Sequence, residues 1–279
     1  MPAVGAKRCI AIGNFDGVHL GHQWILDAAL EMSERLRVRS SVLSFEPHPR
    51  EFFARRARCS ELIPRKIYSL RQKCESLKNH GIQDVFIQRF DSRWAELAPE
   101  AFVGEYLVGR LNASAICVGE DFRFGRSRHG NVEMLRTMAS TYGFVVACPA
   151  AFVSGGKRVS SSSVRELLAA GAFEEVGRVL GRPYQLDGRV TFMARANDER
   201  DHVDFTVRLD NPRPAIEGIF PTSLRVRVGC QSIRAAAIVT INSGSRYAKV
   251  QVPGLQTPLD CGIGASASLA FGTHAAQED

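Results

Sequence analysis

Apolar positions recur with two different periods along the chain, and the change of period divides it in two. In the first part, short apolar runs alternate with amphipathic segments whose apolar residues recur at helical spacing. The runs lie at 9–13, 38–45, 84–88, 115–118 and 144–148. Strands that alternate with helices form a parallel sheet covered on both faces, with ligands at the carboxyl ends of the strands. The pattern predicts a Rossmann-like α/β domain over residues 1–185.

The second part of the chain, residues 186–279, shows a period of two. At 224–228, Leu and Val alternate with Arg, and further apolar runs at 235–241 and 247–252 are separated by Gly, Pro and Asn residues. This pattern is typical of short antiparallel strands joined by turns. We therefore expect a small antiparallel, β-barrel-like domain after a boundary at 183–188.

Net charge differs between the two parts. The 279 residues include 36 basic and 29 acidic side chains, a formal charge of +7. Ten of each sign lie in 186–279, which leaves 26 basic and 19 acidic residues in 1–185. A basic domain suits an anionic small molecule or a nucleic acid. Because no Lys/Arg tract is interleaved with aromatic residues, we expect phosphorylated small molecules and no nucleic acid.

Cysteine usage and hydropathy indicate the compartment. The seven cysteines form no Cys-x-x-Cys pair, and several lie inside apolar runs, which favours reduced, mostly buried thiols over a disulfide framework or a zinc site. No apolar run reaches eighteen residues, and the apolar stretch near the N-terminus is too short for a signal peptide. We therefore expect a cytoplasmic protein with no membrane partner.

The strongest chemical signal follows the first predicted strand. Residues 13–22 read Gly-Asn-Phe-Asp-Gly-Val-His-Leu-Gly-His and open a helix. Glycines let the backbone approach a ligand, and a helix N-terminus offers N–H groups to phosphate. His19 and His22 share one helical face and can donate to phosphate oxygens, while Gly21 leaves space for a nucleotide. The alternative is a capped helix whose histidines are exposed by chance.

The serine run at 160–163 is a second candidate anion site. Ser163 with Glu166 fits a capping box, which explains Ser163 but none of the three serines before it. Hydroxyl groups before a helix N-terminus, together with Arg165 on the first turn, suit phosphate, because a guanidinium matches phosphate geometry.

These segments resemble a known family. Segment 13–22 resembles the fingerprint of the HxGH nucleotidylyltransferases, and its Phe-Asp-Gly-Val-His form is similar to the adenylyltransferase module of prokaryotic bifunctional riboflavin kinase/FAD synthetases. Four further stretches resemble family motifs in order and spacing: Phe-Glu-Pro-His-Pro at 45–49, Val-Gly-Glu-Asp-Phe-Arg-Phe-Gly at 118–125, Val-Ser-Ser-Ser-Ser-Val-Arg at 159–165 and Leu-Gly-Arg-Pro-Tyr at 180–184. The resemblance covers about residues 8–190.

The resemblance implies a reaction and a set of site residues. The phosphate of FMN would attack the α-phosphorus of ATP to give FAD and pyrophosphate, with Mg²⁺ carried by the ATP phosphates and no metal ligand from the protein. The catalytic residues implied are His19, His22 and Arg165. The nucleotide-binding residues implied are Gly13, Asn14, Phe15, Asp16, Gly17, Gly21, Ser161 and Ser162. The flavin-binding residues implied are Pro47, His48, Asp121, Phe122 and Phe124.

Several of these residues have a purely structural alternative. Asp16 can be a turn or cap residue. Pro47 and His48 can simply end a strand, because proline fits neither a helix interior nor a sheet ladder. Phe122 and Phe124 can anchor a loop in the core, although an isoalloxazine ring also needs aromatic or apolar walls.

The β-domain lacks the marks of the family's riboflavin kinase, which are a Gly-x-Pro-Thr-Ala-Asn motif soon after the first strand and a later catalytic glutamate. Residues 191–200 contain no such motif, and the Pro-Thr pair at 221–222 is followed by Ser-Leu. Near the expected glutamate, residues 248–252 contain no carboxylate. We therefore predict that residues 186–279 form a degenerate riboflavin-kinase-like domain without kinase activity.

Two other functions are compatible with this sequence. One is a nucleotidylyltransferase for another phosphorylated acceptor, against which Phe122 and Phe124 favour a flavin. The other is a non-catalytic flavin- or nucleotide-binding paralogue whose β-domain docks a protein partner. The presence of His19, His22, Asp121 and Arg165 counts against a pure binder. No particular partner of the β-domain is predicted.

Overall fold

The computed structural model describes residues 5–194, 202–228, 231–254 and 263–272. Contacts divide the chain into two compact units, which are described separately. The sheet unit comprises Met1–Pro64 and Lys73–Val159, and the barrel unit comprises Arg65–Gln72 and Ser160–Asp279.

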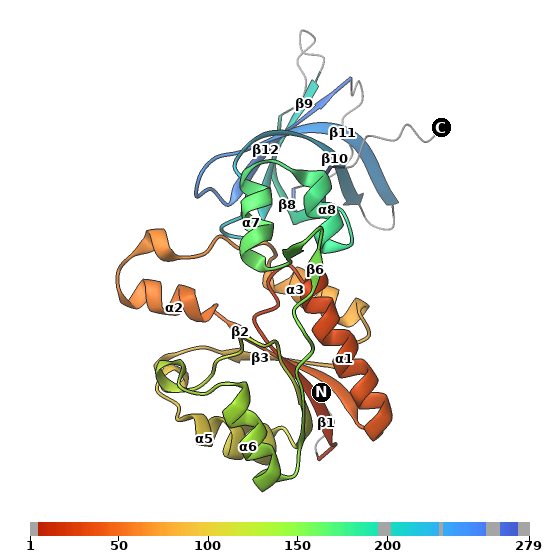
Figure 1. The fold of residues 1–279 in the computed structure, drawn as a ribbon. Coiled ribbons are helices and arrows are strands. Elements are labelled where there is room, and N and C mark those ends of the chain that lie inside the picture. Colours follow the sequence, from red (N-terminus) through yellow and green to blue (C-terminus); the bar gives the residue numbers. More distant parts are fainter. Residues whose placement is uncertain (1–4, 195–201, 229–230, 255–262, 273–279) are drawn as a thin grey trace. The chain divides into compact units, whose positions relative to one another are not determined.

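A five-stranded parallel sheet forms the centre of the sheet unit, in the order β3-β2-β1-β4-β5 (Figure 1). Its strands are β1 (Arg8–Ile12), β2 (Arg39–Glu46), β3 (Asp84–Arg89), β4 (Ala113–Cys117) and β5 (Val145–Ala147). Ile10 of β1 pairs with Ser41 on one side and Ile116 on the other. The central strand β1 is buried throughout, and the predicted parallel α/β fold is confirmed.

Nine helices lie between or beside the described strands of this part of the chain. They are α1 (Leu20–Leu36), α2 (Pro49–Arg56), η1 (Ser60–Leu62), α3 (Leu70–Asn79), α4 (Ser92–Ala95), α5 (Pro99–Ala101), the π-helix η2 (Phe102–Arg110), η3 (Arg126–Arg128) and α6 (Val132–Tyr142). Because successive side chains of a strand point to opposite faces, Cys9 and Ala11 pack with α1 and α3, whereas Ile10 and Ile12 pack with η2 and α6. A short hairpin, β6 (Val153–Ser154) and β7 (Lys157–Arg158), follows β5.

The barrel unit contains a closed antiparallel barrel in the order β10-β11-β12-β9-β8-β13. Its strands are β8 (Tyr184–Ala194), β9 (His202–Leu209), β10 (Gly218–Val228), β11 (Gln231–Ile241), β12 (Tyr247–Pro253) and β13 (Ser266–Phe271). Pairing of β10 with both β11 and β13 closes the barrel, which removes exposed strand edges. The predicted β-domain is confirmed as a barrel.

Two helices, α7 (Ser161–Ala169) and α8 (Phe173–Leu180), belong to the barrel unit. Their buried residues Val164, Leu168 and Val176 pack in the same core as the barrel strands. By these contacts, the chain passes from the sheet unit to the barrel unit before α7. The sequence interpretation counted α7 and α8 with residues 1–185. The assignment of separate activities to residues 1–185 and 186–279 stays a prediction.

The described cysteines are free thiols. Cys9 and Cys117 are buried, with their sulfur atoms 3.6 Å apart. Their hydrogen bond, together with burial, raises the pKa of Cys117. Cys59 is exposed, and Cys230 and Cys261 lie outside the described residues. Among the helices of the described ranges, none is long and apolar enough to span a membrane.

Candidate active site

The loop between β1 and α1 has a strained backbone. Phe15 and Val18 have φ angles of 49° and 40°, in the left-handed region that residues with a Cβ disfavour, β-branched valine most of all. Gly17 has a φ of 83°, which glycine adopts without strain. Phe15 and Val18 are both buried in the core shared by α1 and the sheet. Strain of this kind persists only where the surroundings impose it, and it is concentrated at functional sites.

His19 and His22 stack at the N-terminus of α1. His19 is the N-cap residue, and its Nδ1 accepts a hydrogen bond from the backbone N–H of His22 at 3.3 Å. The two ring centroids are 3.7 Å apart and the ring planes are 20° apart. Because Nδ1 of His19 is an acceptor, the proton of the neutral ring lies on Nε2. Two imidazoles and a helix N-terminus thus meet in one place, a combination that suits an anion.

At two positions of this segment, close packing leaves little room for any residue other than glycine. A Cβ on Gly21 would lie 2.7 Å from the carbonyl oxygen of Val159, and a Cβ on Gly13 would lie 3.2 Å from the ring of Phe15. Both positions therefore have a structural reason for glycine that is independent of a nucleotide. Contacts of Gly13 and Gly21 with a nucleotide stay predictions.

The polar residues of the loop are shielded from solvent. Asp16 is buried, and Asn14 is half-buried. The side-chain oxygen Oδ1 of Asn14 is buried and accepts no hydrogen bond from the part of the chain that the structure describes. A buried acceptor without a donor is costly, so Oδ1 of Asn14 is a candidate contact for a donor group of a ligand.

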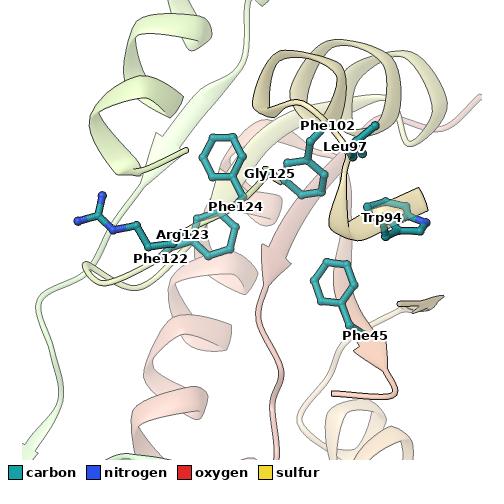
Figure 2. Close-up of a pocket in the computed structure, with 8 residues that line it drawn as sticks. All are labelled: Phe45, Trp94, Leu97, Phe102, Phe122, Arg123, Phe124 and Gly125. Atoms are coloured by element: carbon teal, nitrogen blue, oxygen red, sulfur yellow. The ribbon is translucent and has the colours of Figure 1, made fainter. Parts of the chain in front are cut away.

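A small aromatic pocket lies at the carboxyl ends of β2 and β4 (Figure 2). It is lined by Phe45, Trp94, Leu97, Phe102, Phe122, Arg123, Phe124 and Gly125. Phe122 and Phe124 stack with their ring centroids 5.5 Å apart, and Phe45 meets Trp94 edge-on at 5.8 Å. Figure 2 shows the guanidinium of Arg123 pointing away from the rings. The walls are apolar and flat, and the cavity volume is about 60 Å³.

The two predicted flavin-binding phenylalanines differ in burial. Phe124 is 6% exposed, and its ring is tilted against that of Phe102 with the centroids 5.4 Å apart. It leaves no room for a Cβ on Gly130, which would lie 2.6 Å from its ring. Phe124 therefore anchors its loop as well as lining the pocket. Phe122 is only half-buried, so it is the more accessible of the two rings.

The other predicted flavin-binding residues have visible structural roles. His48 is the N-cap of α2, and its Nδ1 accepts a hydrogen bond from the N–H of Arg50 at 3.0 Å. Pro47 follows a cis peptide bond. Asp121 is exposed, with its Oδ1 3.0 Å from a guanidinium nitrogen of Arg158. These three residues do not line the aromatic pocket, and their contacts with flavin stay predictions.

The N-cap of α7 lies three residues before the predicted one. Ser160 is the N-cap: its Oγ accepts from the N–H of Ser163 at 3.2 Å, and Oγ of Ser163 accepts from the N–H of Ser160 at 3.0 Å. The capping box predicted for Ser163 and Glu166 is therefore wrong, because Ser163 already lies inside the helix. The box leaves Ser161 and Ser162 at the first two helical positions, where backbone N–H groups lack acceptors within the helix.

Arg165 is oriented by backbone carbonyl groups of the barrel unit. Its Nε donates to the carbonyl oxygen of Arg65 at 2.6 Å, and its Nη1 donates to that of Ser161 at 3.2 Å. These bonds fix the direction of the guanidinium beside the first turn of α7. Arg165, Ser161 and Ser162 are thus close to one another within their own unit.

The central strand of the parallel sheet leads into a helix whose N-terminus carries the His-x-Gly-His segment, the segment that resembles the fingerprint of nucleotidylyltransferases. Residues 2–163 match the family described as FAD synthetase. The chain belongs to this FAD synthetase family.

Related proteins agree with this assignment. A bifunctional riboflavin kinase/FMN adenylyltransferase of Haemophilus influenzae is 32% identical over 220 residues, which cover 79% of this chain and 70% of that protein. Proteins of the same name are 35% identical in Pseudomonas fluorescens, with 79% and 69% covered, and 36% identical in Escherichia coli K12, with 65% and 56% covered. A solved structure titled macrolide-efflux protein from Streptococcus pneumoniae shares the fold, with a TM-score of 0.75 at 20% identity over 96% of this chain and 85% of that one.

Six residues that line the pocket are not among the predicted flavin-binding residues: Phe45, Trp94, Leu97, Phe102, Arg123 and Gly125. Phe45 ends β2, at the sheet edge where ligands of parallel sheets bind, so the strand prediction alone could have found it. Trp94 lies on the four-residue helix α4, which no local pattern connects with β2 or β4. Only the tertiary fold brings Trp94 to the pocket.

The observed cap can be tested by its effect on stability. We expect Ser160→Ala to lower the free energy of unfolding by about 1 kcal/mol, because the N–H of Ser163 loses its acceptor. Ser162→Ala, at an exposed position outside the box, should change it by less than about 0.5 kcal/mol. Urea denaturation followed by circular dichroism measures both. Equal effects of the two substitutions would show that Ser160 is not the cap.

Proposed function

We propose that this chain makes FAD by transferring AMP from ATP to FMN, with release of pyrophosphate, and that its barrel does not phosphorylate riboflavin. The first half agrees with membership of the FAD synthetase family and with the names of the relatives. The observation that carries it is the stacked pair His19 and His22 at the N-terminus of α1.

The chemistry proposed for this site is charge stabilisation. A phosphate oxygen of FMN attacks the α-phosphorus of ATP, the bond to the oxygen that bridges to the β-phosphorus breaks, and pyrophosphate leaves with the electron pair. The nucleophile is already an anion, so positioning and electrostatic stabilisation suffice without a general base. We assign His19, through Nε2–H, and His22 to the oxygens of the α-phosphate and the departing pyrophosphate. Segment 13–17 and Gly21 would contact the nucleotide.

We assign the β- and γ-phosphates to Ser161, Ser162 and Arg165, as the family resemblance implies. The first-turn N–H groups of α7 and a guanidinium suit phosphate oxygens. Mg²⁺ would enter as part of the substrate, bound to the ATP phosphates. Within the described ranges, no group of three or more His, Cys, Asp or Glu side chains could hold a metal ion.

The aromatic pocket is our candidate for the isoalloxazine ring. Phe122 offers a half-exposed ring, and Phe45 and Trp94 add further apolar wall. The cavity of about 60 Å³ is smaller than the several hundred Å³ typical of ligand sites, so the ring would enter only if aromatic side chains move apart. Pro47, His48, Asp121 and Phe124 would complete the flavin site.

The proposed loss of kinase activity rests on the sequence. Residues 195–200, part of the segment that lacks the kinase motif, lie outside the described residues. Among the described barrel strands, alternate positions such as Val203, Phe205 and Val207 fill the interior with apolar side chains. Thr222 is the buried polar residue of these strands, and its hydroxyl donates to the carbonyl of Ala237. A kinase needs groups that bind phosphate and activate a hydroxyl, and the family motifs that would supply them are missing from residues 191–200 and 248–252.

Product analysis distinguishes the candidate functions. With Mg-ATP, we expect the purified protein to convert FMN to FAD and to leave riboflavin unchanged, as measured by chromatography of the flavins. FMN formed from riboflavin would contradict the loss of kinase activity. An absence of product from both flavins would favour the binding paralogue or another phosphorylated acceptor.

The role of His19 can be separated from its role as a helix cap. Asparagine is also a good N-cap, so His19→Asn keeps the acceptor for the N–H of His22 and removes the imidazole N–H. We expect His19→Asn to lower the rate of FAD formation by roughly 100-fold or more at an unchanged melting temperature. His129→Ala, at an exposed position of the same unit, is the control and should keep the wild-type rate. A rate within about threefold of wild type in His19→Asn would rule out donation by His19.

A further inference from the structure

Lys73 is a buried cation beside the loop that follows β1. It lies on α3 with its side chain 9% exposed, and its Nζ is 3.3 Å from the carbonyl oxygen of Asn14 and 3.2 Å from Oγ of Ser44. Oε2 of Glu46 is 4.0 Å away. A buried ammonium group is costly unless it is paired and hydrogen-bonded, so these acceptors help to hold Nζ in place.

The carbonyl group of Asn14 is held from two sides. Its oxygen accepts from Oγ of Ser44 at 3.1 Å and from Nζ of Lys73. One residue earlier, the N–H of Gly13 donates to the carbonyl of Leu43 at 3.2 Å. The loop is therefore attached to β2 by its backbone and to α3 by a charge-assisted hydrogen bond, which is stronger than a neutral one.

This attachment acts on the strained residue. The carbonyl of Asn14 and the nitrogen of Phe15 belong to one peptide unit, and the rotation of that unit about the N–Cα bond of Phe15 is the φ angle of 49°. Holding the carbonyl oxygen in place therefore opposes relaxation of Phe15 out of the left-handed region. Relaxation there would shift the chain four residues before His19.

We propose that Lys73 is a positioning residue for ATP: it fixes the Asn14–Phe15 peptide and adds a positive charge beside the nucleotide loop. The proposal rests on the proposed function of this loop. The charge contributes because a cation shielded from water acts on an anionic ligand with little screening. Lys73 belongs to none of the motifs found in the sequence, so only the tertiary fold shows this role.

Direct measurement of ATP binding tests the proposal. We expect Lys73→Met to raise the Kd of a non-hydrolysable Mg-ATP analogue by roughly tenfold or more, measured by calorimetry, because one charge-assisted hydrogen bond and one charge are lost. The rise in melting temperature on adding the analogue should shrink accordingly. Lys73→Arg keeps the charge and should keep most of the affinity. Lys78→Met, at an exposed position of the same helix, is the matched control and should bind like wild type.

A second variant covers the case in which Lys73→Met does not fold. Ser44→Ala keeps the charge and removes the other donor to the Asn14 carbonyl, so the Kd should rise by about threefold to tenfold. In the double variant, the two effects should not add, because both donors act on one oxygen atom.

The results that would overturn the positioning role of Lys73 differ from those that would refute the proposed function. A Kd of Lys73→Met within about twofold of wild type, or a lower melting temperature with the full nucleotide-induced rise, would make Lys73 a purely structural residue. If only Ser44→Ala folds, an unchanged Kd of this variant for the analogue would show that holding the Asn14 carbonyl does not contribute to ATP binding. A wild-type protein that binds the analogue but makes no FAD would refute the proposed function and leave the binding test of Lys73 valid.

Discussion

The backbone of the loop after β1 is the constraint on which the site depends. Phe15 and Val18 adopt left-handed angles that their side chains disfavour, and burial of both side chains against α1 and the sheet holds them there. Since α1 begins directly after this loop, the same constraint determines where its first turn and the stacked imidazoles of His19 and His22 lie. The core of the sheet unit thus determines the geometry of the site.

Residues of the candidate site also stabilise the backbone around it. His19 caps α1, His48 caps α2, and Phe124 anchors the loop after β4. A residue with two such roles cannot be replaced without changing both, which is why His19→Asn is more informative than His19→Ala. Catalysis by positioning needs groups that are fixed before substrate binds, and hydrogen-bonded caps and buried rings provide this.

The sequence predicts the architecture well because apolar runs alternate with segments of helical spacing in the first part of the chain and give way to a period of two in the second. Alternation along β1 places Cys9 and Ala11 on one face and Ile10 and Ile12 on the other, and the barrel strands follow a period of two. Local detail was harder to predict. The serine run contains several possible caps, and only the extended backbone of Ser160 decides between them. Trp94 reaches the pocket through tertiary packing that no local pattern encodes.

The fate of the phosphates of ATP tests the central claim most directly. The protein is incubated with a mixture of FMN and riboflavin and with Mg-ATP radiolabelled at either the α- or the γ-phosphate, and the flavins and pyrophosphate are separated. The account predicts that the α label appears in FAD and that the γ label is recovered entirely in pyrophosphate, apart from unreacted ATP. A γ label in FMN, or no α label in any flavin, would contradict it.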